Sequence, residues 1–158
     1  MKKLLLIRHA KATHETGYAD FERPLKYSGL QDAAVMAARL HEHWLIPQFL
    51  ISSPALRAIT TANIFTEHLS LPQPETDRRI YDADQDTLIE VVRELPDTHD
   101  FIALAGHNPG FSQLLYYFTK QLRDMETCAT VLITFKQKKW VDLTIYSGEI
   151  TYYSSPGA

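Results

Sequence analysis

The sequence predicts an α/β fold of three layers, α/β/α, in which a mostly parallel central sheet has helices on both faces. Short apolar runs, typical of strands buried on both faces, alternate along the chain with segments of helical periodicity. The chain then ends in closely spaced strand-like segments joined by short turns, which predict antiparallel late strands. A length of 158 residues suits one domain, so we expect a single domain over residues 1–158.

The first strand and the first helix have clear signals. Residues 4–7 form an uninterrupted apolar run, which predicts a buried strand. Ser28 and Gln31 fit a capping box, so a helix is expected to begin at Ser28 and to end before Pro47. Its apolar positions recur at helical spacing and are Leu30, Ala33, Ala34, Ala37, Leu40 and Trp44.

The second strand and helix repeat this arrangement. Residues 49–51 are apolar and predict a strand. Ser53 followed by Pro54 is typical of a helix N-cap with proline in the first turn, and this helix is expected to run to about residue 69. The apolar side chains that we expect it to bury are Leu56, Ile59, Phe65 and Leu69.

The middle of the chain continues the alternation. Residues 76–81 predict a weak third strand, and residues 101–105 predict a strongly apolar fourth strand. Between them, residues 87–95 place their apolar side chains on one helical face, so a helix is expected there.

The last third of the chain predicts one helix and the late strands. Asn108 and Pro109 repeat the combination of a cap and a first-turn proline. The helix that follows is expected to bury Phe111, Leu114, Leu115, Phe118 and Leu122. Residues 130–135 and 141–146 predict two strands joined by a basic turn, and residues 150–153 are expected to extend the edge of the sheet.

Composition argues against several classes of function. The formal net charge is −3 and the sequence pI is about 6.1, so no overall basic field would attract nucleic acid. No apolar run approaches the roughly 20 residues that cross a bilayer, so no membrane partner is expected. The single cysteine, Cys128, leaves no internal disulfide, and early charges interrupt any secretory signal, so we expect a cytoplasmic protein.

Cationic and titratable side chains recur where a predicted strand gives way to a loop or a helix. They are Arg8 and His9 after the first strand, Arg57 after the second, and His107 and Asn108 after the fourth. Because the carboxyl ends of parallel strands meet at one edge of a sheet, we expect these side chains to converge. Helix N-termini favour anions, and the arginine fork matches the oxygens of phosphate. The sequence therefore predicts a site for a compact, multiply charged anion such as phosphate.

Such a site suits phosphoryl transfer. A neutral imidazole can carry a phosphoryl group covalently, and nearby cations disfavour protonation of His9. The equatorial oxygens then need positive charge around them, which Arg8, Arg57 and a protonated His107 would supply. A backbone carbonyl on the other ring nitrogen of His9 would select the tautomer that attacks.

These residues resemble the motifs of the histidine phosphatase superfamily, which has the phosphoglycerate-mutase-like fold. The matching motifs are Arg8-His9-Ala10, Ser52-Ser53-Pro54-Ala55-Leu56-Arg57-Ala58 and Gly106-His107. Similarity to the small SixA-type phosphohistidine phosphatases lies in Asp20-Phe21-Glu22-Arg23-Pro24-Leu25, Tyr81-Asp82-Ala83 and Gly106-His107-Asn108-Pro109-Gly110. Each motif alone is a weak signal, but four in order at strand–helix junctions are a strong one.

The resemblance implies a role for each residue of the anion site. His9 is implied as the phosphorylated nucleophile, and Arg8, Arg57 and His107 as the pocket that holds the phosphoryl group. Asn108 is expected to contribute to substrate binding. Neither a metal nor another cofactor is implied.

The proton donor and the outer substrate contacts stay open. Asp82, which follows the weak third strand, is the favoured donor, with Asp20 and Glu22 as alternatives. Arg23 is a candidate for substrate binding, and a structural salt bridge is an equal alternative for this side chain.

The sequence thus predicts a metal-independent phosphatase that works through a covalent phosphohistidine. The favoured partner is a phosphorylated protein, such as a histidine phosphocarrier of a phosphorelay. Residues 58–106 are taken up by predicted helices and strands, which leaves no room for a helical lid, and an open site suits a phosphorylated side chain. A small phosphorylated substrate is the alternative for an enzyme. A non-catalytic phosphate-binding module is the alternative of another class.

Overall fold

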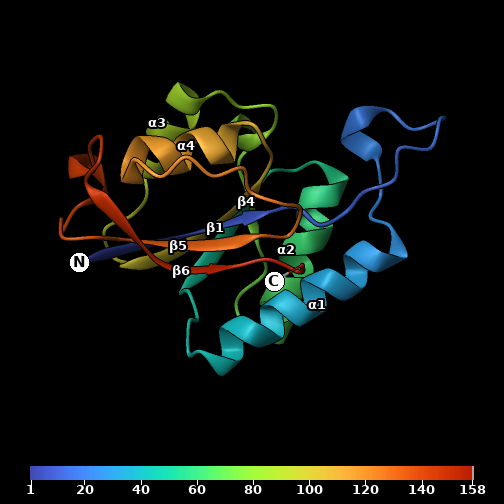
Figure 1. Ribbon diagram of the computed structural model, residues 1–158, viewed down its shortest axis with the longest axis horizontal. Coiled ribbons are helices and arrows are strands. Elements are labelled where there is room, and N and C mark those ends of the chain that lie inside the picture. The colour runs from blue at the N-terminus through green and yellow to red at the C-terminus, as the bar shows by residue number, and fades with distance from the viewer. Residues whose placement is uncertain (158) are drawn as a thin grey trace.

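The computed structural model describes residues 1–157, which form a six-stranded sheet between two layers of helices (Figure 1). The strands are β1 (Lys2–Arg8), β2 (Phe49–Ser52), β3 (Glu75–Thr76), β4 (Phe101–Gly106), β5 (Thr130–Phe135) and β6 (Gly148–Ser154). The α-helices are α1 (Tyr27–Glu42), α2 (Leu56–His68), α3 (Gln85–Arg93) and α4 (Gly110–Thr119). The predicted three-layer α/β/α architecture is confirmed.

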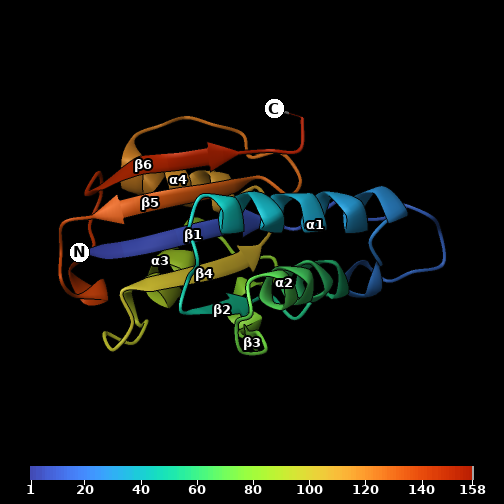
Figure 2. The ribbon, with the colours of Figure 1, turned by 90° about the horizontal axis from the view of Figure 1, so that it is seen from below.

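The strand order places the two site-bearing strands next to each other. The order is β3-β2-β4-β1-β5-β6, and the first four strands are parallel (Figure 2). β5 is antiparallel to β1, and β6 is antiparallel to β5, so the predicted antiparallel late strands are confirmed. Arg8 at the end of β1 pairs with Gly106 at the end of β4. His9 and His107 therefore leave the sheet side by side at its carboxyl edge.

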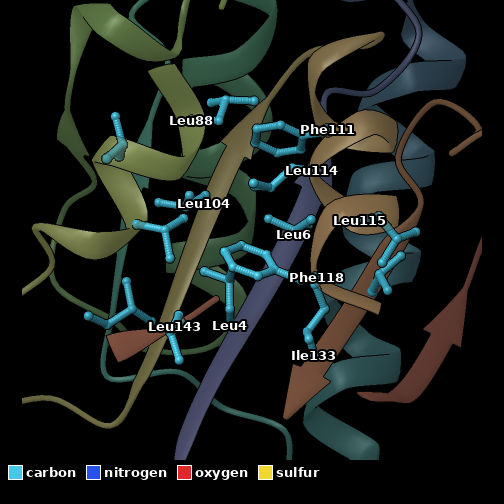
Figure 3. Packing of buried hydrophobic residues seen from close by; sticks show 14 of the residues in the cluster. Leu4, Leu6, Leu88, Leu104, Phe111, Leu114, Leu115, Phe118, Ile133 and Leu143 are labelled. Carbon is cyan, nitrogen blue, oxygen red and sulfur yellow. The ribbon is translucent and has the colours of Figure 1, made fainter. Parts of the chain in front are cut away.

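Two hydrophobic cores hold the helices on the sheet. On one face, Leu4 and Leu6 of β1 pack with side chains of α3 and α4, among them Phe111 (Figure 3). On the other face, Leu5 and Ile7 pack with side chains of α1 and α2. Successive side chains of a strand point to opposite faces, so both cores draw on β1. This is the physical reason for the uninterrupted apolar run at the start of the sequence.

The first helix differs from its prediction at both ends. α1 begins one residue earlier than expected and has no side-chain cap, so the predicted capping box of Ser28 and Gln31 is wrong. The backbone holds the entry to the helix instead, because the N–H of Lys26 donates to the carbonyl of Lys11 (2.9 Å). At its other end the helix stops before Trp44, which is 85% exposed rather than buried.

The helices that leave the site begin later than predicted. α2 begins at Leu56, and the hydroxyl of Ser53 accepts a hydrogen bond from the N–H of Ala55 (3.2 Å). α4 begins after Pro109, and the side chain of Asn108 accepts from the N–H of Ser112 (3.1 Å). Both polar side chains thus satisfy backbone donors near a helix start, although neither is the N-cap residue itself.

Two further elements are shorter than the sequence suggests. The third strand has two residues, and Arg78–Ile80 then form a 3-10 turn. α4 ends because Lys120 adopts the left-handed conformation (φ 62°). Leu122, which was expected on the buried face of this helix, lies beyond it and is 87% exposed.

The predicted strand over residues 141–146 is wrong. The chain there forms the 3-10 turn Trp140–Asp142 and then a loop. Trp140 is fully buried, and its ring N–H donates to the carbonyls of Pro96 and His99 in the loop before β4. An anchored aromatic side chain, not alternation along a strand, thus explains the apolar character of this segment. The final strand is β6, which includes residues 150–153 as expected.

No helix within residues 1–157 combines the length and the apolar character that are needed to cross a membrane.

Candidate active site

Two imidazoles meet at the carboxyl edge of the sheet. The ring centroids of His9 and His107 lie 5.2 Å apart, and each residue is 8% exposed. Arg8 and Arg57 line the same cavity as the two histidines, and this cavity has a volume of about 270 Å³. The structure thus brings Arg8, His9, Arg57 and His107 together, as expected from their positions at three strand–helix junctions.

The chain leaves strand geometry at His9, which lets His9 share a cavity with its neighbour Arg8. The N–H of His9 donates to the carbonyl of Gly106 (2.9 Å), beyond the last residue of β1. The N–H of Ala10 then donates to the hydroxyl of Thr61 on α2 (3.0 Å). Thr61 had no sequence signal for this role, because the contact joins segments that are far apart in the chain.

The hydrogen bond of His9 selects its tautomer. Nδ1 of His9 lies 2.7 Å from the carbonyl oxygen of Ala10, and a carbonyl only accepts, so Nδ1 carries the proton and Nε2 keeps its lone pair. Burial lowers the pKa of His9 to about 4, with further lowering by Arg57 and Arg8, although the bond to Ala10 opposes this. At neutral pH His9 is therefore an unprotonated imidazole with a free Nε2.

His107 is oriented by Ser53. Nε2 of His107 lies 2.8 Å from the Ser53 hydroxyl oxygen, which also accepts from the N–H of Ala55. We assign the hydroxyl hydrogen to Nε2, which puts the imidazole proton on Nδ1, and Nδ1 has no partner among residues 1–157. Burial, followed by His9 and Arg57, lowers the pKa of His107 to about 3. His107 is therefore neutral at neutral pH, and the protonated form expected from the sequence is wrong for the free protein.

The guanidinium groups of Arg8 and Arg57 are anchored but keep free donors. Arg8 donates through Nη1 to the carbonyl of Met125 (2.8 Å). Arg57 donates to the carbonyl (2.7 Å) and to the carboxylate (3.1 Å) of Asp20. The Nε groups of both arginines are buried and have no partner in the described part of the chain. Buried N–H groups without partners are costly, so together with Nδ1 of His107 they favour a bound anion.

Asp20 lies at the centre of a hydrogen-bond network beside this cavity. Its carboxylate accepts from the hydroxyl of Tyr81 (2.6 Å), from Nε of Arg23 (3.1 Å) and from Nη2 of Arg57 (3.1 Å). These bonds, that of Tyr81 most of all, lower the pKa of Asp20 to about 2. Asp20 is part of the long segment between β1 and α1, which extends past the carboxyl end of β1 (Figure 1).

The other predicted site residues lie around the cavity. The expected salt bridge between Arg23 and Asp20 is present, and Arg23 also lines the cavity, so its role in substrate binding stays a prediction. Asp82 is exposed and lines a smaller cavity of about 70 Å³, which is also lined by Arg57 and His107. Asn108 lines both cavities.

Glu22, the third candidate donor, is exposed and lines neither of the two cavities. Residues 1–157 contain no group of three or more His, Cys, Asp or Glu side chains arranged to hold a metal ion.

Comparison with known sequences agrees with this arrangement of residues. Residues 4–100 match the profile of the histidine phosphatase superfamily, branch 1. The chain belongs to the histidine phosphatase superfamily. An uncharacterized protein of Mycobacterium tuberculosis is 29% identical to this superfamily member over 109 residues, which are 68% of this chain and 66% of the relative. The match thus takes in slightly less than two thirds of that relative's length.

Solved structures share the fold. The protein histidine phosphatase SixA, in complex with tungstate, superposes with a TM-score of 0.85 at 20% identity, covering 98% of this chain and 97% of SixA. A mycobacterial glucosyl-3-phosphoglycerate phosphatase superposes with a TM-score of 0.67 at 15% identity, covering 98% of each chain. The expected resemblance to the superfamily and to SixA is confirmed, and so is the phosphoglycerate-mutase-like fold.

Proposed function

We propose that this member of the histidine phosphatase superfamily is a phosphatase in which His9 is the phosphorylated nucleophile. One observation carries the proposal: His9 is an unprotonated imidazole with a free Nε2, and it shares a cavity with the guanidinium groups of Arg8 and Arg57. A nucleophile needs the lone pair, and a phosphoryl group needs the positive charge.

In the first step, Nε2 of His9 attacks the substrate phosphorus in line with the leaving group. The N–P bond forms as the bond to the leaving group breaks, and the leaving group departs with the electron pair. The free N–H groups of Arg8, Arg57 and His107 donate to the non-bridging oxygens. The carbonyl of Ala10 accepts from Nδ1 and stabilises the positive charge that the imidazole ring gains.

In the second step, water attacks the phosphohistidine. The new O–P bond forms as the N–P bond breaks, and the electron pair of that bond returns to Nε2. The water proton passes to the base that donated a proton in the first step, or to solvent. Inorganic phosphate leaves, and His9 is again neutral with its proton on Nδ1.

Asp82 is the proposed proton donor. Its exposed side chain lines the smaller cavity, which adjoins the phosphate pocket through Arg57 and His107. Asp20 is the weaker candidate, because three hydrogen bonds favour its ionised form and lower its pKa to about 2. Protonation of Asp20 would weaken these three bonds, which makes Asp20 a poorer source of the proton.

The proposed substrate is phosphohistidine on a protein, such as a phosphorelay carrier. Three exposed residues also line the cavity and are accessible to another macromolecule, namely Lys11, His14 and Lys26. An imidazole also leaves phosphorus more readily than an alkoxide, so this substrate needs less help from an acid. SixA, described as a protein histidine phosphatase, supports this substrate class by similarity of fold.

A small phosphate ester is the second candidate substrate. Its support is the structural similarity to glucosyl-3-phosphoglycerate phosphatase, whose described substrate is a small molecule. Turnover of a phosphorylated carrier domain and of a panel of phosphorylated metabolites separates the two candidates. A higher kcat/KM for the carrier domain supports the protein substrate, and a higher value for a metabolite supports the ester.

The phosphoenzyme itself is the test of the proposed function. Rapid quenching after mixing with ³²P-labelled phosphohistidine should trap one acid-labile phosphoryl group per chain. The His9→Asn variant should trap none, whereas His68→Asn, at the end of α2, should be labelled like the wild type. If the wild-type protein binds phosphate but never becomes labelled, the non-catalytic phosphate-binding module is the better description.

A further inference from the structure

Two lysines that the proposed mechanism does not use line the cavity beside His9. These are Lys11 and Lys26, and both residues are exposed. The cavity volume of about 270 Å³ is roughly nine times the ~30 Å³ that one water molecule occupies in the liquid. The space therefore extends beyond what a single phosphoryl group fills.

The lining also has more positive charge than one phosphoryl group requires. A phosphate monoester carries about two negative charges at neutral pH, which Arg8 and Arg57 balance. Arg23 is already paired with Asp20. Within residues 1–157, neither Lys11 nor Lys26 forms a salt bridge, and no Asp or Glu side chain lines the cavity. Glu126 shares a neighbouring cavity with Lys11 but forms no salt bridge with it, so both ammonium groups are free to pair with an anion in the cavity beside His9.

The backbone holds these two lysines next to each other and close to the nucleophile. Residues 11–13 and 24–26 pair as antiparallel segments, in which the N–H of Lys26 donates to the carbonyl of Lys11 (2.9 Å). Gly29 of α1 lies against the same carbonyl, where any Cβ would collide with the oxygen. Chain geometry keeps the Cα of Lys11 within about 7 Å of the Cα of His9. The spacing between the lysine pair and the nucleophile is therefore built into the fold.

We propose that Lys11 and Lys26 bind a second anionic group of the substrate, a carboxylate or a phosphate on the molecule whose phosphoryl group His9 attacks. This proposal rests on the proposed function and adds a requirement on substrate chemistry. A protein substrate supplies the group as an Asp or Glu side chain next to the phosphohistidine. A small substrate supplies it as a second acidic group of its own. A substrate with one phosphoryl group alone leaves both ammonium groups unpaired.

Binding of two phosphonates tests this proposal without any need for turnover. Methylphosphonate and phosphonoacetate differ by one carboxylate, and neither is hydrolysed. Calorimetry should show about tenfold tighter binding of phosphonoacetate to the wild-type protein, as expected for charge-assisted hydrogen bonds at an exposed site. The Lys11→Gln/Lys26→Gln variant should lose this preference and keep its affinity for methylphosphonate.

A matched control uses Lys136→Gln/Lys138→Gln, which removes two exposed lysines from the connection between β5 and β6 and should keep the preference. Equal affinity of the wild-type protein for the two phosphonates would overturn the proposal. So would an equal loss of affinity for both phosphonates in the Lys11→Gln/Lys26→Gln variant, because this indicates a general change of charge or fold.

Turnover then identifies the source of the second anion. One pair of substrates is a phosphohistidine peptide with Glu neighbours and the same peptide with Gln neighbours. The other pair is 3-phosphoglycerate and glycerol 3-phosphate. A preference for the Glu peptide that the double variant lacks indicates a protein, and a preference for 3-phosphoglycerate that it lacks indicates a metabolite. Equal turnover within both pairs overturns the second-anion site and leaves the proposed phosphatase activity intact. If none of the four substrates is turned over, the proposed phosphatase activity is contradicted. The phosphonate binding experiment then decides by itself whether Lys11 and Lys26 bind a second anion.

Discussion

The hydroxyl oxygen of Ser53 lies 2.8 Å from Nε2 of His107, and both residues are buried. Ser53 follows β2 and His107 follows β4, which is the parallel neighbour of β2 in the sheet. Nε2 accepts the hydrogen bond from the Ser53 hydroxyl, which leaves Nδ1 of His107 as the free donor. Ser53 is thus a positioning residue, which acts on the phosphoryl group through His107.

Replacement of Ser53 should therefore slow phosphoenzyme formation. The Ser53→Ala variant is expected to lose about tenfold in single-turnover rate, because the His107 ring is no longer held in one tautomer and orientation. Ser53→Thr, which keeps the hydroxyl, should recover most of the rate. ¹⁵N NMR of the imidazole should show a mixture of His107 tautomers in Ser53→Ala only.

The neighbouring serine provides the control for this prediction. The hydroxyl of Ser52 donates to the carbonyl of Ser53 (2.8 Å) and is also buried. Ser52→Ala should keep the wild-type tautomer of His107. If both alanine variants lose rate equally and neither changes the tautomer, the Ser53 hydroxyl serves only the local fold.

His9 should stay unprotonated well into the acid range. Burial is the main cause of its low pKa, so an NMR titration of the free protein should show half-protonation near pH 4. Because the pKa is lowered, the Nε2 lone pair is present above that pH and is lost as the pH falls through it. Arg57→Gln should move the midpoint upward, since Arg57 disfavours the imidazolium. The control Arg79→Gln should not, because Arg79 is exposed and pairs with Asp77 and Glu94 away from His9. A midpoint near the ordinary value of 6.5 would contradict the buried, cation-flanked site.

The two low histidine pKa values also predict how stability depends on pH. The folded-state values are about 4 for His9 and about 3 for His107, both below the unfolded value of 6.5. Between these limits the unfolded chain binds more protons, so stability falls as the pH falls. Each histidine should contribute about 2 to 3 kcal/mol to this loss between pH 6.5 and pH 4.5.

Urea unfolding at a series of pH values measures this effect. In His107→Asn, the free energy of unfolding should fall less steeply over the same range, because one of the two proton-binding groups is absent. The comparison uses the slope and not the absolute stability, so it holds even if the substitution itself is destabilising. A slope equal to that of the wild type would mean that His107 takes up its proton at the same pH in the folded and the unfolded chain, which contradicts a lowered pKa.

Replacement of Asp82 should matter most when the leaving group is a poor one. Loss of a general acid typically costs 10²-fold or more, so Asp82→Asn is expected to lose about 10²-fold in kcat on an alkyl phosphate. The loss on p-nitrophenyl phosphate should be much smaller, because nitrophenolate leaves without a proton. Asp86→Asn, an exposed position in the first turn of α3, is the matched control.

Asp20→Asn decides between the two candidate donors. If the loss on the alkyl phosphate appears in Asp20→Asn and not in Asp82→Asn, the proton comes from Asp20. Phosphate binding must then first release this carboxylate from Arg57 and Tyr81.

Local patterns were sufficient for the strands that carry the site. A strand buried on both faces must be apolar throughout, so residues 4–7, 49–51 and 101–105 were recognisable, and the polar residues that follow them marked the functional edge. The same logic failed at residues 141–146. Burial of Trp140 there comes from a contact with the loop before β4, which periodicity does not represent.

The sequence by itself determined the layered α/β architecture, the family, and which four side chains would gather at the carboxyl edge. Only the tertiary structure decided their protonation and their partners. Ser53 reaches His107 across 54 positions of the chain, and Tyr81 reaches Asp20 across 61. Charge state and tautomer depend on burial and on hydrogen-bond partners, and those are set by contacts between distant segments. The family motif marks where His9 and His107 are, and the packed molecule determines which of their nitrogens is free.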